Sequence, residues 1–309
     1  MQKKIFALLM FALFALVFAL FAVFSKYHPQ TKTELKALVE NLSINLGVID
    51  TSKITDMRAL FAETKRKDFS GIETWDVSNV KDMSWMFLEA ESFNQNINSW
   101  DVSNVETMDG MFSKASSFNQ PLDKWDVSKV ETMYDMFSRA TSFNQNINAW
   151  NVSNVKDMSS MFSGATSFNQ PLDKWDVSKV RNMEYMFSEA ESFNQNINAW
   201  NVSNVRNMGC MFRGAESFNQ NINSWDVSNV KDMRGMFAGA ESFNQPLDKW
   251  NVSNVEYMLG MFQYAESFNQ NINSWDVSNV EYTDGMFERS PLKKNPPQWY
   301  KEIKISWTQ

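Results

Sequence analysis

Aspartate carboxylates recur every 25 residues along much of the chain, and they are the repeated group best suited to binding a cation. Six of them directly follow a tryptophan: Asp76, Asp101, Asp126, Asp176, Asp226 and Asp276. Calcium is bound by several carboxylate and carbonyl oxygens, which such a row could supply. Asn151, Asn201 and Asn251 interrupt it, so only two of its eight neighbouring pairs place one Asp beside another. Since the glycine-rich nonapeptides of calcium-binding β-rolls are also absent, we interpret the row as a structural column without a metal.

Side chains for catalysis do not converge in the sequence. His28 is the one histidine and Cys210 the one cysteine, so neither a Cys/His zinc site nor an intramolecular disulfide can form. Other copies carry Trp, Asp, Tyr or Gly in the column of Cys210, which we therefore expect to be a solvent-facing, idle thiol. No Ser/His/Asp set or phosphate-binding glycine loop is present. The sequence predicts no enzyme, no cofactor and no metal.

The elements that position these residues repeat with the same period. Tryptophans stand at positions 75, 100, 125, 150, 175, 200, 225, 250 and 275, which gives nine copies of a 25-residue unit without an insertion. A fixed period of roughly 20–50 residues is typical of arrays in which each unit buries its apolar face against the next. Position 106 and its neighbours vary freely, whereas the constant apolar columns are those of Phe93, Ile97, Trp100, Val102, Val105, Met108, Met111, Phe112 and Ala115. We expect these constant columns to form one core.

The pattern within one unit predicts a strand followed by a helix. Trp100 and Val102 alternate with polar residues, as in a short half-buried strand. The next apolar residues have spacings of three and one, typical of a short helix, and Ser103 is placed to cap it. Identical strands one coil apart would pair in parallel, and packed helices need more room than strands, so the stack would curve. The predicted fold is an α/β solenoid of leucine-rich-repeat type, with a parallel sheet of short strands on one side, short helices on the other and a hydrophobic helix in front.

This fold suggests roles for the polar columns. Asn94 and Gln95, present in every FNQ copy, are expected to form amide ladders between coils, and each buried indole N–H should donate to a turn carbonyl. The Asp/Asn column and the lysines that precede three tryptophans would face outwards from the concave strand side. The candidate ligand surface therefore comprises Asp101, Lys124, Asp126, Asn151, Lys174, Asp176, Asn201, Asp226 and Lys249.

The amino terminus predicts export. Residues 5–24 form an unbroken apolar run after two lysines, long enough as a helix to cross the roughly 30 Å hydrocarbon layer. We expect residues 1–25 to be a signal peptide or a membrane anchor, which places the rest outside the cytoplasm. The other expected divisions are residues 26–47 as a linker with an N-terminal capping helix, 48–290 as one degenerate and nine regular repeats, and 291–309 as a C-terminal cap.

The units "MFSGATSFNQPLDKWDVSKVRNM" and "FNQNINSWDVSNV" and the ending "SPLKKNPPQWYK" resemble the repeat of the BspA-like leucine-rich-repeat bacterial surface proteins. The match covers roughly Asp50 to Lys301. The resemblance implies an exported repeat protein with a role in adhesion, and it brings no catalytic residues with it. The long apolar run stands where those proteins carry a lipoprotein signal.

Three functions of different classes follow from these patterns. The leading hypothesis is an exported, envelope-tethered protein, membrane-anchored through residues 5–24 or secreted, that binds an unknown protein or glycan at the cell surface. A structural spacer without a dedicated ligand is the alternative. A polysaccharide-acting enzyme is weaker, because no copy breaks the pattern with paired acids. The net charge of −7 offers no basic field for phosphate, so no nucleic-acid partner is expected.

Overall fold

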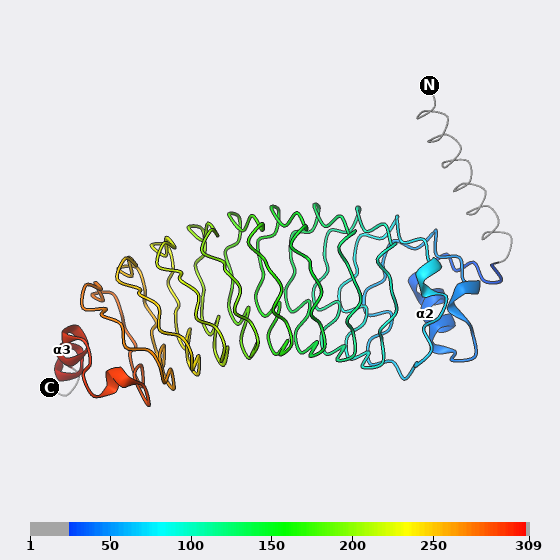
Figure 1. Cartoon of the computed structure of the whole chain (residues 1–309). Helices are drawn as coiled ribbons and strands as arrows, with labels where there is room; N and C mark the ends of the chain where they lie inside the picture. The colour runs from blue at the N-terminus through cyan, green and yellow to red at the C-terminus, as the bar shows by residue number, and fades with distance from the viewer. Residues whose placement is uncertain (1–24, 307–309) are drawn as a thin grey trace, which may run out of the picture.

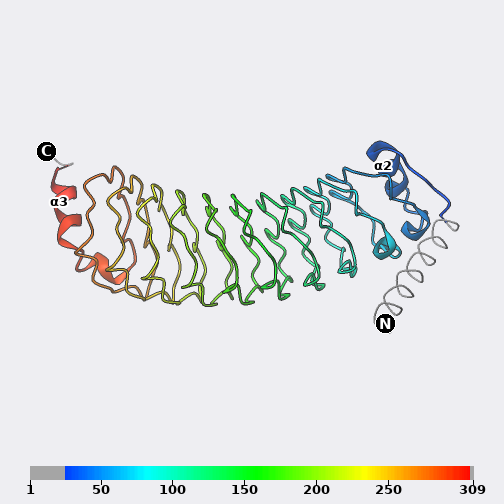
Figure 2. The ribbon, with the colours of Figure 1, turned by 90° about the horizontal axis from the view of Figure 1, so that it is seen from above.

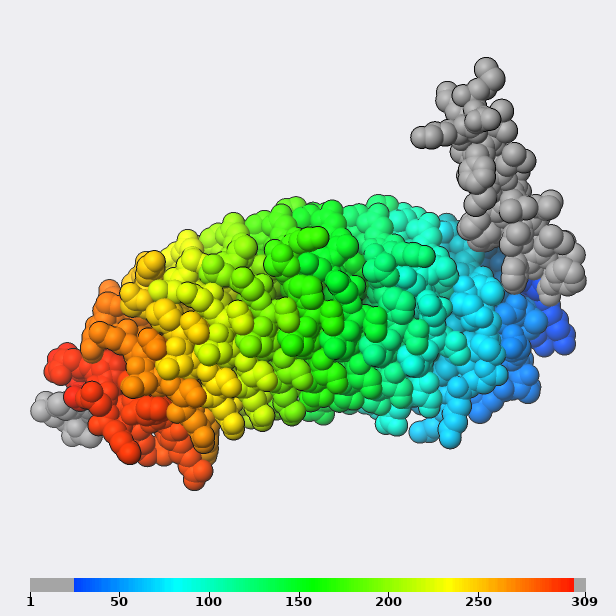
Figure 3. Space-filling model, viewed as in Figure 1, coloured from blue at the N-terminus to red at the C-terminus, as the bar shows by residue number. Residues whose placement is uncertain are grey.

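The protein is an elongated, gently curved stack of coils, seen side by side in two perpendicular views (Figures 1 and 2). The computed structural model describes residues 25–306. Parallel bridges join equivalent residues of consecutive coils, from Asp56 with Asp82 to Tyr257 with Tyr282, so each regular coil takes one 25-residue repeat. On the face shown in Figure 3 the surface runs on from coil to coil, without the gaps that separate beads would leave.

Helices are confined to the ends of the described chain. The first elements are α2 (Lys32–Glu40) and the short 3-10 helices η1 (Leu46–Val48) and η2 (Ile72–Thr74). The last are η3 (Pro291–Lys293) and α3 (Gln298–Ser306). Between η2 and η3 the coils consist of turns and extended segments joined by single bridges.

The predicted α/β solenoid is therefore wrong. Within residues 25–306 no sheet forms, and no helix follows the tryptophan of any repeat. The reason lies in the backbone: Gly110 and Lys114 both have left-handed φ angles, of 56° and 58°, and equivalent residues repeat this in other coils. A residue with a left-handed φ cannot be part of a right-handed helix, so no helix forms across these positions. The predicted hydrophobic front helix lies outside the described residues, among which no helix is long and apolar enough to span a membrane.

Backbone hydrogen bonds alternate between closing turns and joining coils. The N–H groups of Gly110, Phe112 and Lys114 donate to carbonyls one coil further on, at 2.7–2.9 Å. The intervening N–H groups of Met111 and Ser113 donate three residues back within their own coil, at 3.2 and 3.0 Å. Because both sets are paired, the coil can bury its backbone without helix or sheet.

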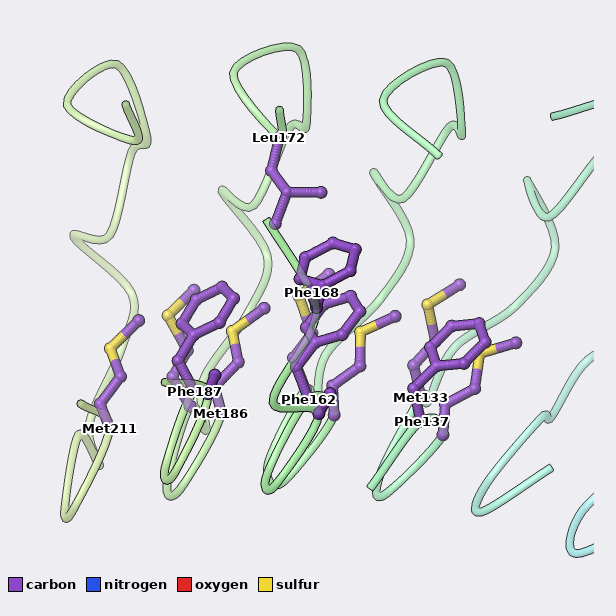
Figure 4. Packing of buried hydrophobic residues seen from close by; sticks show 14 of the residues in the cluster. Met133, Phe137, Phe162, Phe168, Leu172, Met186, Phe187 and Met211 are labelled. Atoms are coloured by element: carbon purple, nitrogen blue, oxygen red, sulfur yellow. The ribbon is translucent and has the colours of Figure 1, made fainter. Parts of the chain in front are cut away.

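The constant columns form one continuous core, as expected from the repeat. Phe112 stacks on Phe137 of the next coil with ring centroids 5.5 Å apart, and Trp125 on Trp150 at 6.3 Å. Figure 4 shows the same arrangement further along, where Phe137, Phe162 and Phe187 occupy equivalent places in successive coils with methionines beside them. All these column residues are buried. Burial of one indole contributes up to about 4–6 kcal/mol.

At the front, α2 is locked to the first coil by a buried arginine. Thr31 caps the helix by accepting from the Glu34 N–H at 3.2 Å. Arg66 is buried and donates five hydrogen bonds to backbone carbonyls, including two to Val39 and one to Asn41 at the C-terminal end of α2. These carbonyls are the negative end of the helix dipole, which stabilises the guanidinium there.

At the far end, α3 extends the tryptophan column by one position. Trp299 lies in its first turn and donates from Nε1 to the Ile272 carbonyl at 2.9 Å. Its ring stacks on Trp275 with centroids 6.3 Å apart. Trp299 thus covers the last regular coil with the same indole hydrogen bond and ring stacking that the tryptophans make between regular coils.

Candidate binding surfaces

All nine residues of the predicted ligand surface are exposed, in the turns on either side of the core tryptophans. The strand that was expected to aim them from a concave sheet is absent. The structure does not gather them into one pocket. They form two rows that run along the stack, one of Asp and Asn and one of Lys.

The Asp/Asn row has a structural role in every regular coil. Asp101 Oδ1 accepts from the Ser103 N–H at 3.1 Å, and the bond recurs at 3.0–3.2 Å from Asp76 to Asp276. This turn requires a short side chain with an acceptor oxygen, which Asp and Asn both supply. Ser103 was expected to cap a helix, and this was wrong: it is the donor that closes the turn.

Hydrogen bonds within the chain lower the pKa of three carboxylates of this row, those of Asp126, Asp176 and Asp276. The hydroxyl and N–H of Ser128 hold the pKa of Asp126 below its ordinary value, and Lys129 adds to the effect. Ser178 does the same for the pKa of Asp176. No group of three or more His, Cys, Asp or Glu that could hold a metal ion occurs within residues 25–306.

The lysine row sits where two kinds of coil meet. Asn98 accepts from the Lys124 N–H at 3.0 Å and donates to Asp123 Oδ1 at 2.9 Å. Asn148 and Asn223 make the same pair of bonds to the coils of Lys174 and Lys249. No ion pair joins the ammonium groups of these three lysines to the Asp/Asn row in the described chain, so they stand free in solvent.

This junction gives a physical reason for the alternation of "NQNIN" and "NQPLDK" copies. Where an NIN copy precedes a PLDK copy, the second asparagine is buried, as at Asn98, Asn148 and Asn223. Where the alternation fails, Asn198 meets a second NIN copy and is exposed. There its side chain accepts from the Ser224 hydroxyl at 2.5 Å and makes neither of the two bonds that Asn98 makes to the next coil.

The predicted bonding of the FNQ amides between coils is confirmed, but each glutamine bonds the asparagine of the preceding coil and not its own copy. Asn94 Oδ1 accepts from the Asn119 N–H at 3.0 Å and from Gln120 Nε2 at 3.1 Å. Asn119 Oδ1 serves the next coil in the same way, and the series continues to Asn269. The ladder ties the FNQ turns of successive coils together.

A third row, of charged residues at the freely varying position 106, was missed as a surface. Its members are Lys81, Glu106, Glu131, Lys156, Arg181, Arg206, Lys231, Glu256 and Glu281. Their backbone N–H groups donate to the carbonyl of the preceding member at 2.8–3.0 Å, so the row is held on a continuous hydrogen-bonded line. Lys81 pairs with Glu106 at 3.2 Å, and Lys156 and Lys231 pair with neighbouring glutamates at 2.6 Å. The signal in the sequence was charge at a period of 25.

Exposed aromatic residues cluster on the last regular coils. Tyr257 and Tyr282 face each other with ring centroids 5.5 Å apart, and Leu259 is exposed two residues from Tyr257. Tyr264 stacks beneath the guanidinium of Arg289 at 5.1 Å. Exposed aromatic rings of this kind are enriched where proteins meet partners.

Cys210 differs from its predicted setting. Its side chain is buried, and Sγ donates to the Arg234 carbonyl at 3.5 Å. Burial raises the pKa of the Cys210 thiol, which keeps it protonated and a weak nucleophile. His28 lies at the front of the stack, with Nδ1 3.2 Å from Asp50 Oδ2.

Comparison with known families identifies a repeat family. The model of a family described as "Mycoplasma protein of unknown function, DUF285" matches residues 33–147, 121–216 and 194–299. These three tandem matches together span most of the chain and support a repeat surface-protein family, although they do not single out the BspA-like proteins. No curated protein matches the chain.

Proposed function

Because the chain belongs to the DUF285 family of Mycoplasma proteins, we propose that it is an exported, envelope-tethered, non-enzymatic protein that binds other macromolecules through its extended surface. The tandem family matches support a surface role, and the apolar run at residues 5–24 supports export and tethering. The repeat sequence supports the closer resemblance to BspA-like surface proteins and their adhesive role. The partner is a protein or glycan at a cell surface.

The observation that carries this proposal is that the buried columns are constant whereas exposed columns vary. The constant core columns give every regular coil the same backbone conformation. Exposed positions such as 106 vary in charge and size without changing that conformation. A surface held rigid before binding loses little conformational entropy when a partner arrives. The stack therefore suits display of many side chains in fixed register.

The test is capture by the full-length protein in detergent micelles. Cell-wall material and host-cell surface extracts are passed over immobilised protein, and retained components are identified. Replacing Lys124, Lys174 and Lys249 together by Gln should weaken retention, because their side chains face solvent and their loss leaves the turns intact. Matched replacement of the exposed Lys53, Lys65 and Lys67 in the first coil serves as the control. If the wild-type protein retains no component from any extract, binding is not its function.

A structural spacer is the second candidate, and the Asp/Asn row favours it. Every member of that row is used in a turn of its own coil, which explains its residue type without any ligand. A spacer predicts that deleting two coils, residues 126–175, alters envelope behaviour in proportion to length. Substitutions of exposed side chains would then leave that behaviour unchanged. No observation in the described structure favours the polysaccharide-acting enzyme in this way.

A further inference from the structure

Four consecutive members of the position-106 row are cations, although the protein as a whole carries a net charge of −7. They are Lys156, Arg181, Arg206 and Lys231, all exposed. Backbone hydrogen bonds of 2.9 Å join each to the one before it. Coils joined in this way lie about 4.8 Å apart on the bonded side, so the four cations form an evenly spaced line along the stack.

The two ends of this line are neutralised and its middle is not. Lys156 pairs with Glu131 in the coil before it, and Lys231 with Glu256 in the coil after it. Arg181 and Arg206 form no ion pair in the described structure, and each is the other's neighbour. Two adjacent guanidinium groups repel one another, so the arrangement favours any anion that comes between them.

The adjoining bridge column reinforces this pattern. Its members in the same four coils are Asp157, Asn182, Asn207 and Asp232. Acids thus lie beside the two paired lysines, and neutral amides lie beside the two arginines. Glu184, three residues after Arg181, is engaged with Arg234 at 3.2 Å and with Asn207 Nδ2 at 3.0 Å. The arginines are left available for charge from outside the chain.

We propose that Arg181 and Arg206 form a binding site for a linear acidic polysaccharide that lies along the stack, an inference that rests on the proposed binding function. Guanidinium groups bind carboxylate and sulfate groups through paired N–H donors, and both occur on acidic sugars. An extended polymer with regularly spaced anions matches a line of one cation per coil. A globular acidic partner would have no reason to match that regular spacing.

Nucleic acid fits this surface less well. Binding to phosphate backbones usually draws on many cationic contacts, and single strands also stack their bases on exposed aromatic rings. The exposed large aromatic residues of the described chain, such as Tyr134 and Tyr257, lie in other coils. Only two unpaired cations are available here, within a protein of net negative charge.

The experiment measures binding of the full-length protein in detergent micelles to immobilised polygalacturonate, which carries carboxylates, and dextran sulfate, which carries sulfates. Neutral dextran, polyglutamate and single-stranded DNA are the comparison probes. The Arg181→Gln/Arg206→Gln double variant should lose at least about tenfold in affinity for the preferred acidic polysaccharide. The Arg139→Gln/Arg213→Gln variant changes net charge equally with exposed arginines of other columns, and should bind like wild type.

Two further variants keep the result interpretable. Arg181→Lys/Arg206→Lys retains charge but not paired donors, and should fall between the wild type and the glutamine variant. Circular dichroism and melting temperature establish that each variant folds. The Lys124, Lys174 and Lys249 triple variant should bind acidic polysaccharide unchanged, which separates this site from the surface tested above.

Several outcomes would overturn the inference. Equal binding by the wild type and the folded glutamine variant would show that Arg181 and Arg206 do not form the binding site. Stronger binding to DNA or polyglutamate than to either acidic polysaccharide would assign the line of cations to another partner. If the wild type retains a cell-surface component but binds neither acidic polysaccharide, this inference fails while the proposed function stands. If it retains nothing at all, both fail.

Discussion

Trp125 Nε1 donates to the carbonyl oxygen of Ile97, 28 residues earlier, at 3.1 Å. The same carbonyl accepts from the Trp100 N–H of its own coil, also at 3.1 Å. One oxygen therefore closes a turn and anchors the indole of the next coil. This relationship recurs along the stack and explains why each regular copy carries tryptophan rather than another large apolar residue.

Replacing Trp150 by Phe should lower the free energy of unfolding by about 1–2 kcal/mol, because it removes the bond to the Leu122 carbonyl and part of the buried ring. Urea denaturation followed by circular dichroism measures the loss. Trp85→Phe is the matched control, since that ring lies outside the column and is only partly buried. An equal loss at both positions would show that the indole bond contributes nothing specific.

The asparagines at the coil junctions offer a comparison within one chain. Asn98→Ala should destabilise by about 1–2 kcal/mol, because a buried side chain that bonds Lys124 N–H and Asp123 is lost. Asn198→Ala, at the junction where the alternation fails and the side chain is exposed, should cost less than about 0.5 kcal/mol. The same denaturation measurement compares them. A larger effect at Asn198 would refute the explanation of the alternation.

Gly110 and Trp85 should behave as a coupled pair. Gly110 has a φ of 56°, and a Cβ there would lie 2.0 Å from the Trp85 ring. Asp135 and Ser160 adopt the same backbone in equivalent positions, so the ring rather than φ alone excludes a side chain. Gly110→Ala should therefore destabilise strongly in the wild type and much less in a Trp85→Ala background. A double-mutant cycle in urea measures the coupling, and strictly additive effects would contradict it.

Two carboxylates should respond to pH in opposite senses. Burial raises the pKa of Asp109, so its charged form destabilises the folded state above that pKa, and the penalty fades as the pH falls through it. Asp109→Asn should thus raise the melting temperature at pH 7, with a smaller gain near pH 4. Hydrogen bonds from Ser128 lower the pKa of Asp126, whose contribution is present at neutral pH and is lost as the pH falls through the lowered pKa.

Asp126→Asn should accordingly lower the melting temperature slightly at pH 7, since Asn keeps the turn but not the charge. Melting curves of both variants and the wild type at the two pH values provide the comparison. A gain in stability from Asp126→Asn at pH 7, or a gain from Asp109→Asn that grows towards acid, would reverse the assigned signs.

The period of 25 and the constant columns were enough to predict the stacking, the buried core, the indole bonds and the amide ladder. Each depends only on which residues recur, because equivalent residues of adjacent coils must meet. The local backbone was not predictable in the same way. Spacings of three and one also arise from successive turns in which an N–H donates three residues back, as that of Met111 does. Left-handed backbone could not be predicted at Lys114 and Tyr185, because neither residue is glycine.

The candidate site shows a related limit. The Asp/Asn row was expected to be a ligand surface because it would face outwards from a concave strand side, but its recurring Asp or Asn reflects a turn that Asp101 and its equivalents close within their own coil. The row containing Arg181 and Arg206 was overlooked because its members differ from copy to copy. In this repeat array, the columns that vary are the candidates for ligand binding, whereas the constant columns mainly stabilise the fold.

Exchange of the indole N–H protons, followed by NMR in deuterated solvent, tests the central claim most directly. The continuous stack predicts slow exchange for the column tryptophans from Trp75 to Trp275 and for Trp299, with the middle coils slowest, and fast exchange for Trp85. Exchange of the column indoles at the rate of free tryptophan would contradict a hydrogen-bonded stack, and with it the rigid surface on which the proposed binding depends.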